Sequence, residues 1–169
     1  MARLPAPATT SADPMARSVL AHLPRSLRAF QQLYGVLWQD AVLDPVTKEI
    51  ARMRNARVTD CGYCRNVRFD GPRRAGLSEA MLDLVAEGYE ASPLSARHKA
   101  VLRFTDAFLT DPTAFGVPEH EALLAELAPI EIIELAAALA LFMGFSKIAV
   151  ALGTAPASMP LTIVPTPEI

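Results

Sequence analysis

Prolines and capping residues divide this chain into a series of helices, and this pattern restricts the fold more than any other feature of the sequence. Each expected helix start carries either a proline in the first turn or a side chain that can cap it: Pro24, Asp44-Pro45, Asp60, Ser78, Ser95, Pro118 and Pro129. Between these starts apolar residues recur every three or four positions, and the strict alternation typical of strands is scarce. The sequence therefore predicts an all-α fold, a single-domain helical bundle.

The two ends of the chain differ in composition from the helical part. Residues 1–14 are rich in proline, alanine and threonine, and we expect them to form a flexible N-terminal arm. Residues 15–158 should form the single helical domain, whose last helix runs from Pro129 to about Leu152. Residues 159–169 contain three prolines, so this C-terminal tail should run extended over a surface.

The composition argues against several classes of partner. A formal net charge of −2 gives no global field that would favour nucleic acid or an anionic membrane. The longest uncharged run, residues 135–146, is shorter than the roughly 18 to 20 residues that a membrane span needs, so we interpret it as part of a buried core helix. No secretory signal is recognisable, and we expect a cytoplasmic protein. At 51% hydrophobic residues the chain is slightly more apolar than usual, which indicates either surface buried in an oligomer or an alanine-rich helical core.

The two cysteines of the chain, Cys61 and Cys64, stand three residues apart. Side chains at this spacing lie on one face of a helix, so a disulfide between them can close and reopen with little backbone movement. In a cytoplasmic protein such a pair is expected to be catalytic or metal-binding rather than a static cross-link. If Asp60 caps the next helix, both thiols lie in its first turn, where the helix dipole lowers the thiol pKa. Arg68 would then lie one turn beyond Cys64, on the same side.

Other candidate site residues carry weaker signals. A zinc site needs about four suitably spaced ligands, and the histidines stand far from the cysteines in the sequence, so we expect neither a metal nor a cofactor. Phe142, Met143 and Phe145 could wall a pocket around the cysteines, although the ordinary core is the simpler interpretation. The three histidines that stand far from the cysteines are His22, His98 and His120.

Glu49 stands twelve residues before Cys61, on the preceding expected helix. A helical hairpin could bring its carboxylate back to the thiols, where it could relay a proton. The alternative is an ordinary ion pair with Arg52, three residues further along the same helix. The sequence leaves both interpretations open.

These residues together resemble the signature of the alkylhydroperoxidase D-like, or carboxymuconolactone decarboxylase-like, family: Glu49-x-x-Arg52-x-x-x-Ala56-x-x-x-x-Cys61-Gly-Tyr-Cys64. The similarity continues through the Gly-Leu-Ser sequence at residues 76–78 and covers roughly residues 20–152. The family implies an all-α fold that assembles as homo-oligomers, commonly trimers or hexamers.

The resemblance also implies a thiol-dependent peroxidase or disulfide oxidoreductase with an antioxidant role. Cys64 would be the thiolate that attacks a hydroperoxide and becomes a sulfenic acid, and Cys61 would supply a proton and then close a disulfide with it. Glu49 would belong to the proton relay, with Arg52 in a supporting position. The implied partners are a hydroperoxide or another small-molecule substrate and a dithiol protein that reduces the disulfide.

The chain departs from the family pattern at two positions. Many members with this activity carry His four residues after the second cysteine, where this chain has Arg68. Many carry His or another residue just before the second cysteine, where this chain has Tyr63. Arg68 could stabilise a thiolate, but it cannot shuttle protons near neutral pH. Two other functions stay open: acid–base decarboxylation of a small cyclic carboxylate, and a non-catalytic role as an oligomeric redox protein.

Overall fold

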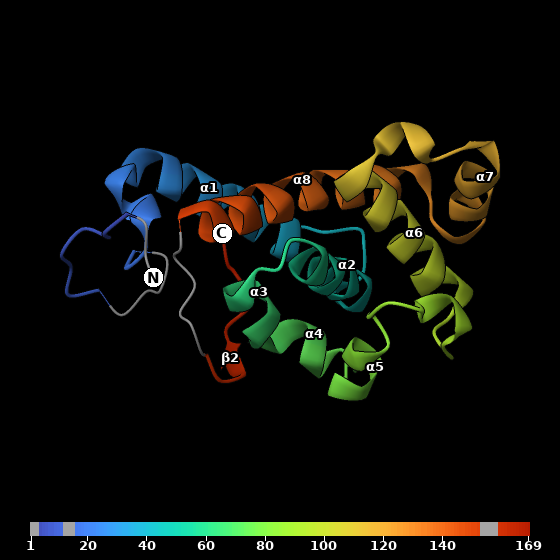
Figure 1. The fold of residues 1–169 in the computed structure, drawn as a ribbon, viewed down its shortest axis with the longest axis horizontal. Coiled ribbons are helices and arrows are strands. Elements are labelled where there is room, and N and C mark those ends of the chain that lie inside the picture. The colour runs from blue at the N-terminus through green and yellow to red at the C-terminus, as the bar shows by residue number, and fades with distance from the viewer. Residues whose placement is uncertain (1–3, 12–15, 153–158) are drawn as a thin grey trace.

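The computed structural model describes residues 4–11, 16–152 and 159–169, and within these ranges most of the chain is helical (Figure 1). The predicted all-α fold is confirmed, with one small two-stranded sheet added to it, formed by β1 (Val67–Phe69) and β2 (Thr162–Val164). The α-helices, in chain order, are α1 (Pro24–Gln39), α2 (Pro45–Val58), α3 (Gly62–Asn66), α4 (Asp70–Arg74), α5 (Glu79–Asp83), α6 (Ala96–Thr110), α7 (Val117–Glu126) and α8 (Pro129–Leu152).

Three of the predicted N-caps are present with the expected hydrogen bond. The Asp44 carboxylate accepts the Thr47 amide at 2.8 Å, and the Ser78 and Ser95 hydroxyls each accept an amide three residues on at 3.2 Å. Each cap gives a partner to an amide that the first helical turn leaves unpaired. The last helix, α8, has the bounds that the sequence predicts.

The predicted cap at Asp60 is wrong. Asp60 adopts a backbone φ of 52°, in the left-handed region, where the chain reverses after α2. The capping position passes to Cys61, whose sulfur accepts the Cys64 amide at 3.3 Å, while the Asp60 carboxylate pairs with exposed Arg65. Helix α3 therefore begins at Gly62 and is five residues long.

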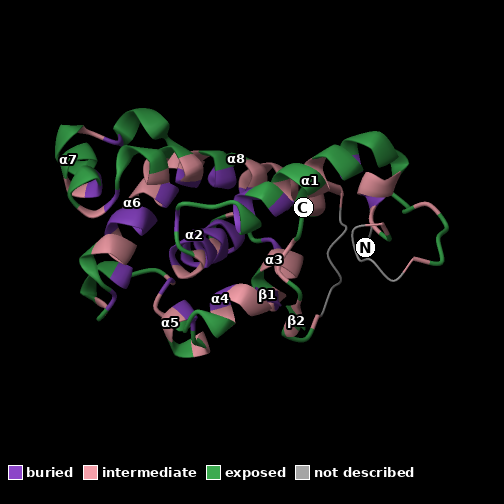
Figure 2. Ribbon diagram, turned by 180° about the vertical axis from the view of Figure 1, so that it is seen from behind, coloured by how far each residue is buried: buried purple, intermediate pink, exposed green. Residues whose placement is uncertain are grey.

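Helix α2 is the centre of the fold and packs against both α6 and α8. All ten residues from Thr47 to Ala56 are buried, and Figure 2 shows this helix as the most continuously buried element. Several of these buried residues are charged, and each of them has a partner of opposite charge: Lys48 with Glu134, Glu49 with Arg52, and Arg54 with Asp106 and Glu87. Such pairing is needed because an unpaired charge in the core is strongly destabilising.

The small sheet joins the C-terminal tail to the segment that follows the cysteines. Strands β1 and β2 run parallel, with Val67, Arg68 and Phe69 opposite Thr162, Ile163 and Val164. The expected position of Arg68 on a helix is therefore wrong, because α3 ends at Asn66 and β1 begins at the next residue.

Helix α8 is long and apolar enough to cross a membrane by length and composition, and 28% of its most apolar window is buried within the fold. A single such helix is weak evidence for a membrane span, because the core helix of a soluble protein passes the same test. Here α8 packs against α1, α2 and α6. Apolar side chains such as Ile130, Ile133 and Val150 remain exposed on it.

Parts of the two chain ends fall outside the described ranges. Residues 4–11 of the expected N-terminal arm contain neither helix nor strand. Residues 1–3 and 12–14 of that arm lie outside the described part of the chain, as do residues 15 and 153–158 of the expected domain.

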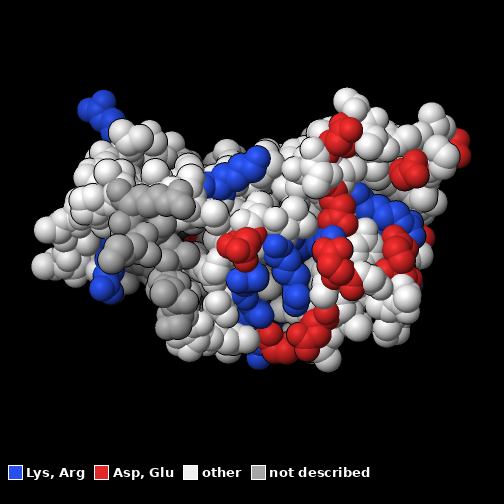
Figure 3. Space-filling model, in the orientation of Figure 1, with Lys and Arg blue, Asp and Glu red and all other residues white. Residues whose placement is uncertain are grey.

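On the face shown in Figure 3, acidic and basic side chains gather over the half of the molecule that contains α4, α5 and α6.

Candidate active site

Cys61 and Cys64 form a disulfide at the junction of α2 and α3, with their Cα atoms 5.2 Å apart. Cys61 is fully buried, whereas Cys64 is partly exposed and lines a cavity of about 800 Å³. The two sulfurs therefore differ in access, and Cys64 is the one that a small molecule in the cavity would meet.

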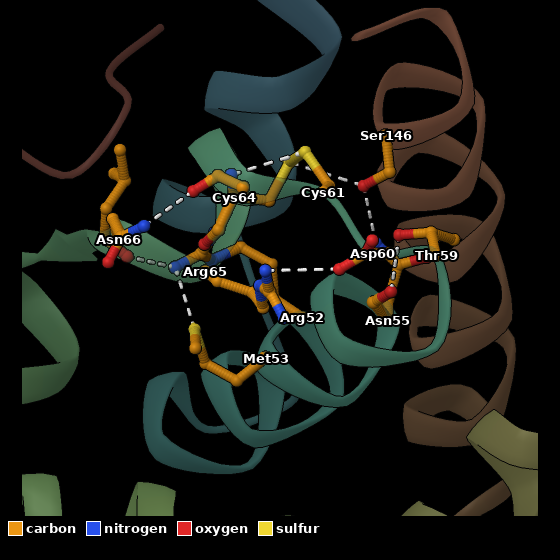
Figure 4. Close-up of a disulfide and its surroundings, with 12 residues drawn as sticks. Arg52, Met53, Asn55, Thr59, Asp60, Cys61, Cys64, Arg65, Asn66 and Ser146 are labelled. Atoms are coloured by element: carbon orange, nitrogen blue, oxygen red, sulfur yellow. Dashed lines mark hydrogen bonds and ion pairs between the residues drawn. A yellow bond between two sulfur atoms is a disulfide. The ribbon is translucent and has the colours of Figure 1, made fainter. Parts of the chain in front are cut away.

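Ser146 of α8 lies directly beside this disulfide (Figure 4). Its hydroxyl oxygen is 3.3 Å from the Cys64 sulfur and accepts a hydrogen bond of 2.9 Å from the Asn55 side-chain amide. Because Asn55 donates to the oxygen, the hydroxyl hydrogen can point to the sulfur. Both Ser146 and Asn55 are 1% exposed, so water competes little for these contacts.

Glu49 and Arg52 form a buried pair below the disulfide. Arg52 donates two hydrogen bonds to the Glu49 carboxylate, at 2.7 and 2.6 Å, and its guanidinium also donates to the carbonyls of Cys64 (3.0 Å) and Val67 (2.6 Å). The ion pair expected as one alternative is thus present. It also joins Glu49 to the backbone of the dithiol segment, through Arg52.

Two tyrosines lie near this pair. Burial raises the pKa of Tyr34, and the negative charge of Glu49 raises it further against the opposing effect of Arg52. The Tyr34 phenol is therefore held protonated. Tyr63, which precedes the partly exposed cysteine, is half-buried and lines the same cavity.

Arg68, in contrast, belongs to the scaffold. It is 7% exposed, pairs with Glu79 of α5 at 3.0 Å, and donates hydrogen bonds to the carbonyls of Arg65 and Val67. It does not contribute to the lining of the cavity. Its charge fastens β1 to α5, and the structure does not bring it to the sulfurs.

The cavity wall is largely apolar and comes from distant parts of the chain. Phe142 and Phe145 of α8 line it, as the first of the two interpretations expects, whereas Met143 does not. Across from them lie five residues of the C-terminal segment 159–169, which we call the C-terminal strap. Aromatic rings from α1, β1 and α8 complete the wall: Phe30, Tyr34, Phe69, Phe142 and Phe145.

Sequence reasoning missed Asn55, Ser146 and the strap as parts of the site. Asn55 stands on α2 six residues after Glu49, so it could have been considered once that helix was suspected. Ser146 is 82 residues from Cys64, inside an apolar helix, and the strap is further still. Neither has a local pattern that would indicate its place.

Comparison with known sequences identifies the family. Residues 24–107, which run from α1 into α6, match the sequence model of the carboxymuconolactone decarboxylase family. Two uncharacterized proteins, each from a strain of Mycobacterium tuberculosis, are 31% identical over 93 residues, which is 55% of this chain and 33% of each relative. The match thus spans a third of the length of these relatives.

Solved structures agree in fold. An uncharacterized peroxidase-related protein from Ralstonia eutropha, with an alkylhydroperoxidase AhpD core, superposes with a TM-score of 0.73 at 21% identity and 93% coverage of both chains. A debrominase, Bmp8, solved as a Cys-to-Ala variant with 2,3,4-tribromopyrrole, has a TM-score of 0.65 at 18% identity, covering 79% of this chain and 72% of its own. These superpositions show that the chain has the alkylhydroperoxidase D-like fold. The chain belongs to the carboxymuconolactone decarboxylase-like family, as its motif predicts.

Proposed function

We propose that this protein is a thiol-dependent peroxidase in which Cys64 and Cys61 form the redox centre. The observation that carries the proposal is the unequal placement of the two sulfurs. Cys64 lines a cavity that can hold a substrate, and Cys61 is buried directly behind it within disulfide distance. A nucleophile needs access to its substrate, whereas a resolving thiol needs only access to the nucleophile.

The reaction would proceed in two balanced steps. The Cys64 thiolate attacks the terminal peroxide oxygen of ROOH, the O–O bond breaks, and the alkoxide takes a proton to leave as ROH, which makes Cys64 a sulfenic acid. The Cys61 thiol then attacks the Cys64 sulfur, and water leaves as the disulfide forms. A dithiol protein would return both thiols to the reduced form by exchange.

The surrounding residues would support these steps through charge and protons. The Ser146 hydroxyl is placed to donate a hydrogen bond to the Cys64 thiolate, which is a stronger acceptor than a disulfide sulfur. Glu49 is the proposed acid–base residue, because it is a buried carboxylate joined to the Cys64 peptide through Arg52. Tyr63 would contact the substrate from the cavity wall.

The test is to count thiols and measure intact mass after one equivalent of hydroperoxide, with wild type and Cys61→Ser. We expect the wild type to lose both thiols rapidly. The variant, which lacks the resolving thiol, should hold a sulfenic acid that a dimedone probe traps at Cys64. Two thiols that survive millimolar peroxide in folded protein would overturn the proposal.

A second candidate reaction is reductive dehalogenation of an aromatic ring, favoured by the aromatic cavity beside Cys64 and by the structural neighbour named as a debrominase. Its balance is ArBr plus two thiols giving ArH, HBr and the disulfide. Acid–base decarboxylation is less well supported, because Arg52, which could hold a substrate carboxylate, is occupied by Glu49. Substitution of both cysteines separates decarboxylation from the two thiol-dependent reactions, since a decarboxylase should keep its activity.

We also propose that the protein acts as a homo-oligomer, a trimer or a hexamer. The support is the set of large apolar side chains that a single chain leaves exposed on neighbouring helices α7 and α8: Val117, Leu124, Ile130 and Ile133. Sedimentation velocity on the full chain tests this, and a single species of monomer mass would contradict it.

A further inference from the structure

The C-terminal strap is fastened to the fold along most of its length. Its strand β2 pairs with β1, whose first residue stands three positions after Cys64. Further on, the Thr166 amide and hydroxyl both donate to the Asp70 carboxylate at 2.8 Å, and the Gly71 amide donates to the Thr166 hydroxyl oxygen at 2.8 Å. Near the end, Gln39 donates to the Pro167 carbonyl at 2.9 Å. Specific hydrogen bonds thus hold the strap in a defined position beside the site.

The alternation of β2 gives the strap an inner and an outer face. Val164 points to the cavity and is paired in register with Phe69, which also lines it. Ile163, the preceding residue, is 53% exposed and does not line the cavity. Adjacent residues of a strand point to opposite faces, so these two side chains offer a matched pair for substitution.

The cavity that the strap closes has the size and lining of a site for a bulky apolar molecule. Its volume of about 800 Å³ lies within the range of about 300 to 1,000 Å³ for drug-sized ligands. Aromatic rings form much of the rest of the wall, including Tyr34 and Phe142 with centroids 5.8 Å apart. A ring-containing substrate would gain free energy by burying its apolar surface here, whereas hydrogen peroxide has no such surface to bury.

The family match supplies only part of this wall, the part that comes from α1 and β1. It covers residues 24–107, which include the dithiol, Glu49, Arg52 and Asn55. The strap and the cavity-lining part of α8 lie beyond residue 107. The matched region therefore holds the dithiol and one side of the wall, whereas the side formed by α8 and the strap must be read from this structure.

We propose that the C-terminal strap determines substrate specificity, because it closes the chamber beside Cys64 and makes it select hydroperoxides with a bulky apolar substituent over hydrogen peroxide. The inference rests on the proposed peroxidase function. The role proposed for the strap leaves the reaction steps at Cys64 as described above. The strap acts on the R group of ROOH, with Val164, Pro165 and Pro167 as the contacts that close the chamber over that group.

The test compares oxidation of the reduced full-length protein by cumene hydroperoxide and by hydrogen peroxide, as the ratio of the two second-order rate constants. We expect wild type to favour cumene hydroperoxide by about tenfold or more, since the burial of about one phenyl face corresponds to more than 1.4 kcal/mol. Val164→Asp, which places a charge on the inner face, should lower this ratio by about tenfold. Ile163→Asp, on the outer face, should keep the wild-type rates and ratio.

A second, less disruptive variant distinguishes an effect on the strap from misfolding of Val164→Asp. Thr166→Val removes the hydroxyl contacts to Asp70 and Gly71 without adding a charge and should also lower the ratio. A wild-type ratio near one would overturn the inference, and so would an unchanged ratio in both Val164→Asp and Thr166→Val.

A binding measurement separates this inference from the proposed function. If neither peroxide removes the thiols, the peroxidase proposal fails, and the chamber is then tested by ligand-observed NMR of 2-phenyl-2-propanol, the alcohol product, with the oxidised protein. We expect saturable binding that Val164→Asp abolishes and Ile163→Asp keeps. An absence of binding to wild type, or equal binding to both variants, would overturn the role of the strap.

Discussion

The hydroxyl oxygen of Ser146 lies 3.3 Å from the sulfur of Cys64, and the two residues are 82 positions apart in the chain. Asn55 holds the hydroxyl from the opposite side, so this buried contact is fixed by two helices. The contact stands where a peroxidatic thiolate would need a hydrogen-bond donor, in a site whose expected histidine position is taken by Arg68.

Removal of the Ser146 hydroxyl should therefore destabilise the thiolate form of Cys64. In a Cys61→Ser background, we expect Ser146→Ala to raise the pKa of the Cys64 thiol by about one unit, or about 1.4 kcal/mol, because the charged form loses a donor. The measurement is the pH dependence of alkylation by iodoacetamide. Ser146→Thr, which retains a hydroxyl, is the matched control, and an equal pKa in all three proteins would show that the contact has no such role.

The Glu49–Arg52 pair should be essential for stability as well as for chemistry. Glu49→Gln leaves the Arg52 charge buried without its partner, so we expect the free energy of unfolding to fall by about 3–5 kcal/mol. Urea denaturation measures this. The double variant Glu49→Leu/Arg52→Met removes both charges and should lose less stability than the sum of the losses in Glu49→Leu and Arg52→Met. Strict additivity of the single effects would contradict the coupling of the pair.

Much of the fold follows from local signals, and the exceptions have physical causes. The bounds of α8 and the caps at Asp44, Ser78 and Ser95 depend on residues close in sequence, so they could be predicted. The three-residue strand β1 could not, because its hydrogen-bond partners lie at the far end of the chain.

The site was predictable to the same degree. The dithiol and the Glu49–Arg52 pair lie within 16 residues and form a recognisable motif. Ser146 is brought to Cys64 by the packing of α8 on α2 and α3, which no local pattern encodes. Asp60 was misplaced as a cap because the reversal after α2 puts its backbone in the left-handed region, a conformation that Asp tolerates.

The close approach of α1 to the strap predicts an effect of a single methyl group. A Cβ on Gly35 would overlap with the carbonyl of Glu168 and lie 2.9 Å from the Ile169 amide nitrogen, so Gly35→Ala should displace the end of the strap. We expect faster hydrogen exchange in a peptide covering residues 159–169, measured by mass spectrometry.

Gly144→Ala on α8 is the matched control for Gly35→Ala. A Cβ there meets nothing within 4 Å, and alanine favours a helix over glycine by about 1 kcal/mol, so exchange in the strap should stay as in wild type. Equal exchange in the Gly35→Ala protein would show that the strap tolerates the added methyl group.

The fastening of the strap at Asp70 should depend on pH. Hydrogen bonds from Thr166, with a smaller effect of Arg74, lower the pKa of Asp70 from 3.8 to about 2. Because the folded state favours the carboxylate, the contribution to stability is fully present above about pH 4 and is lost as the pH falls through about 2.

Carboxyl NMR of Asp70 checks this prediction. The wild-type midpoint should lie at about 2, and Thr166→Val should move it up towards 3.8, further than Arg74→Ala does. A wild-type midpoint near 3.8 would mean that the strap is not held by this carboxylate in solution.

The attachment of the strap to the segment that follows the cysteines also orders events during synthesis of the chain. The anchor at Gly71 and its strap partner Thr166 are 95 residues apart, which a ribosome takes roughly 5 to 20 seconds to translate. During that interval the nascent protein already contains Cys61 and Cys64, while the strap that lines the cavity beside Cys64 has not been made. The dithiol is therefore always made before the segment that completes the wall of its cavity.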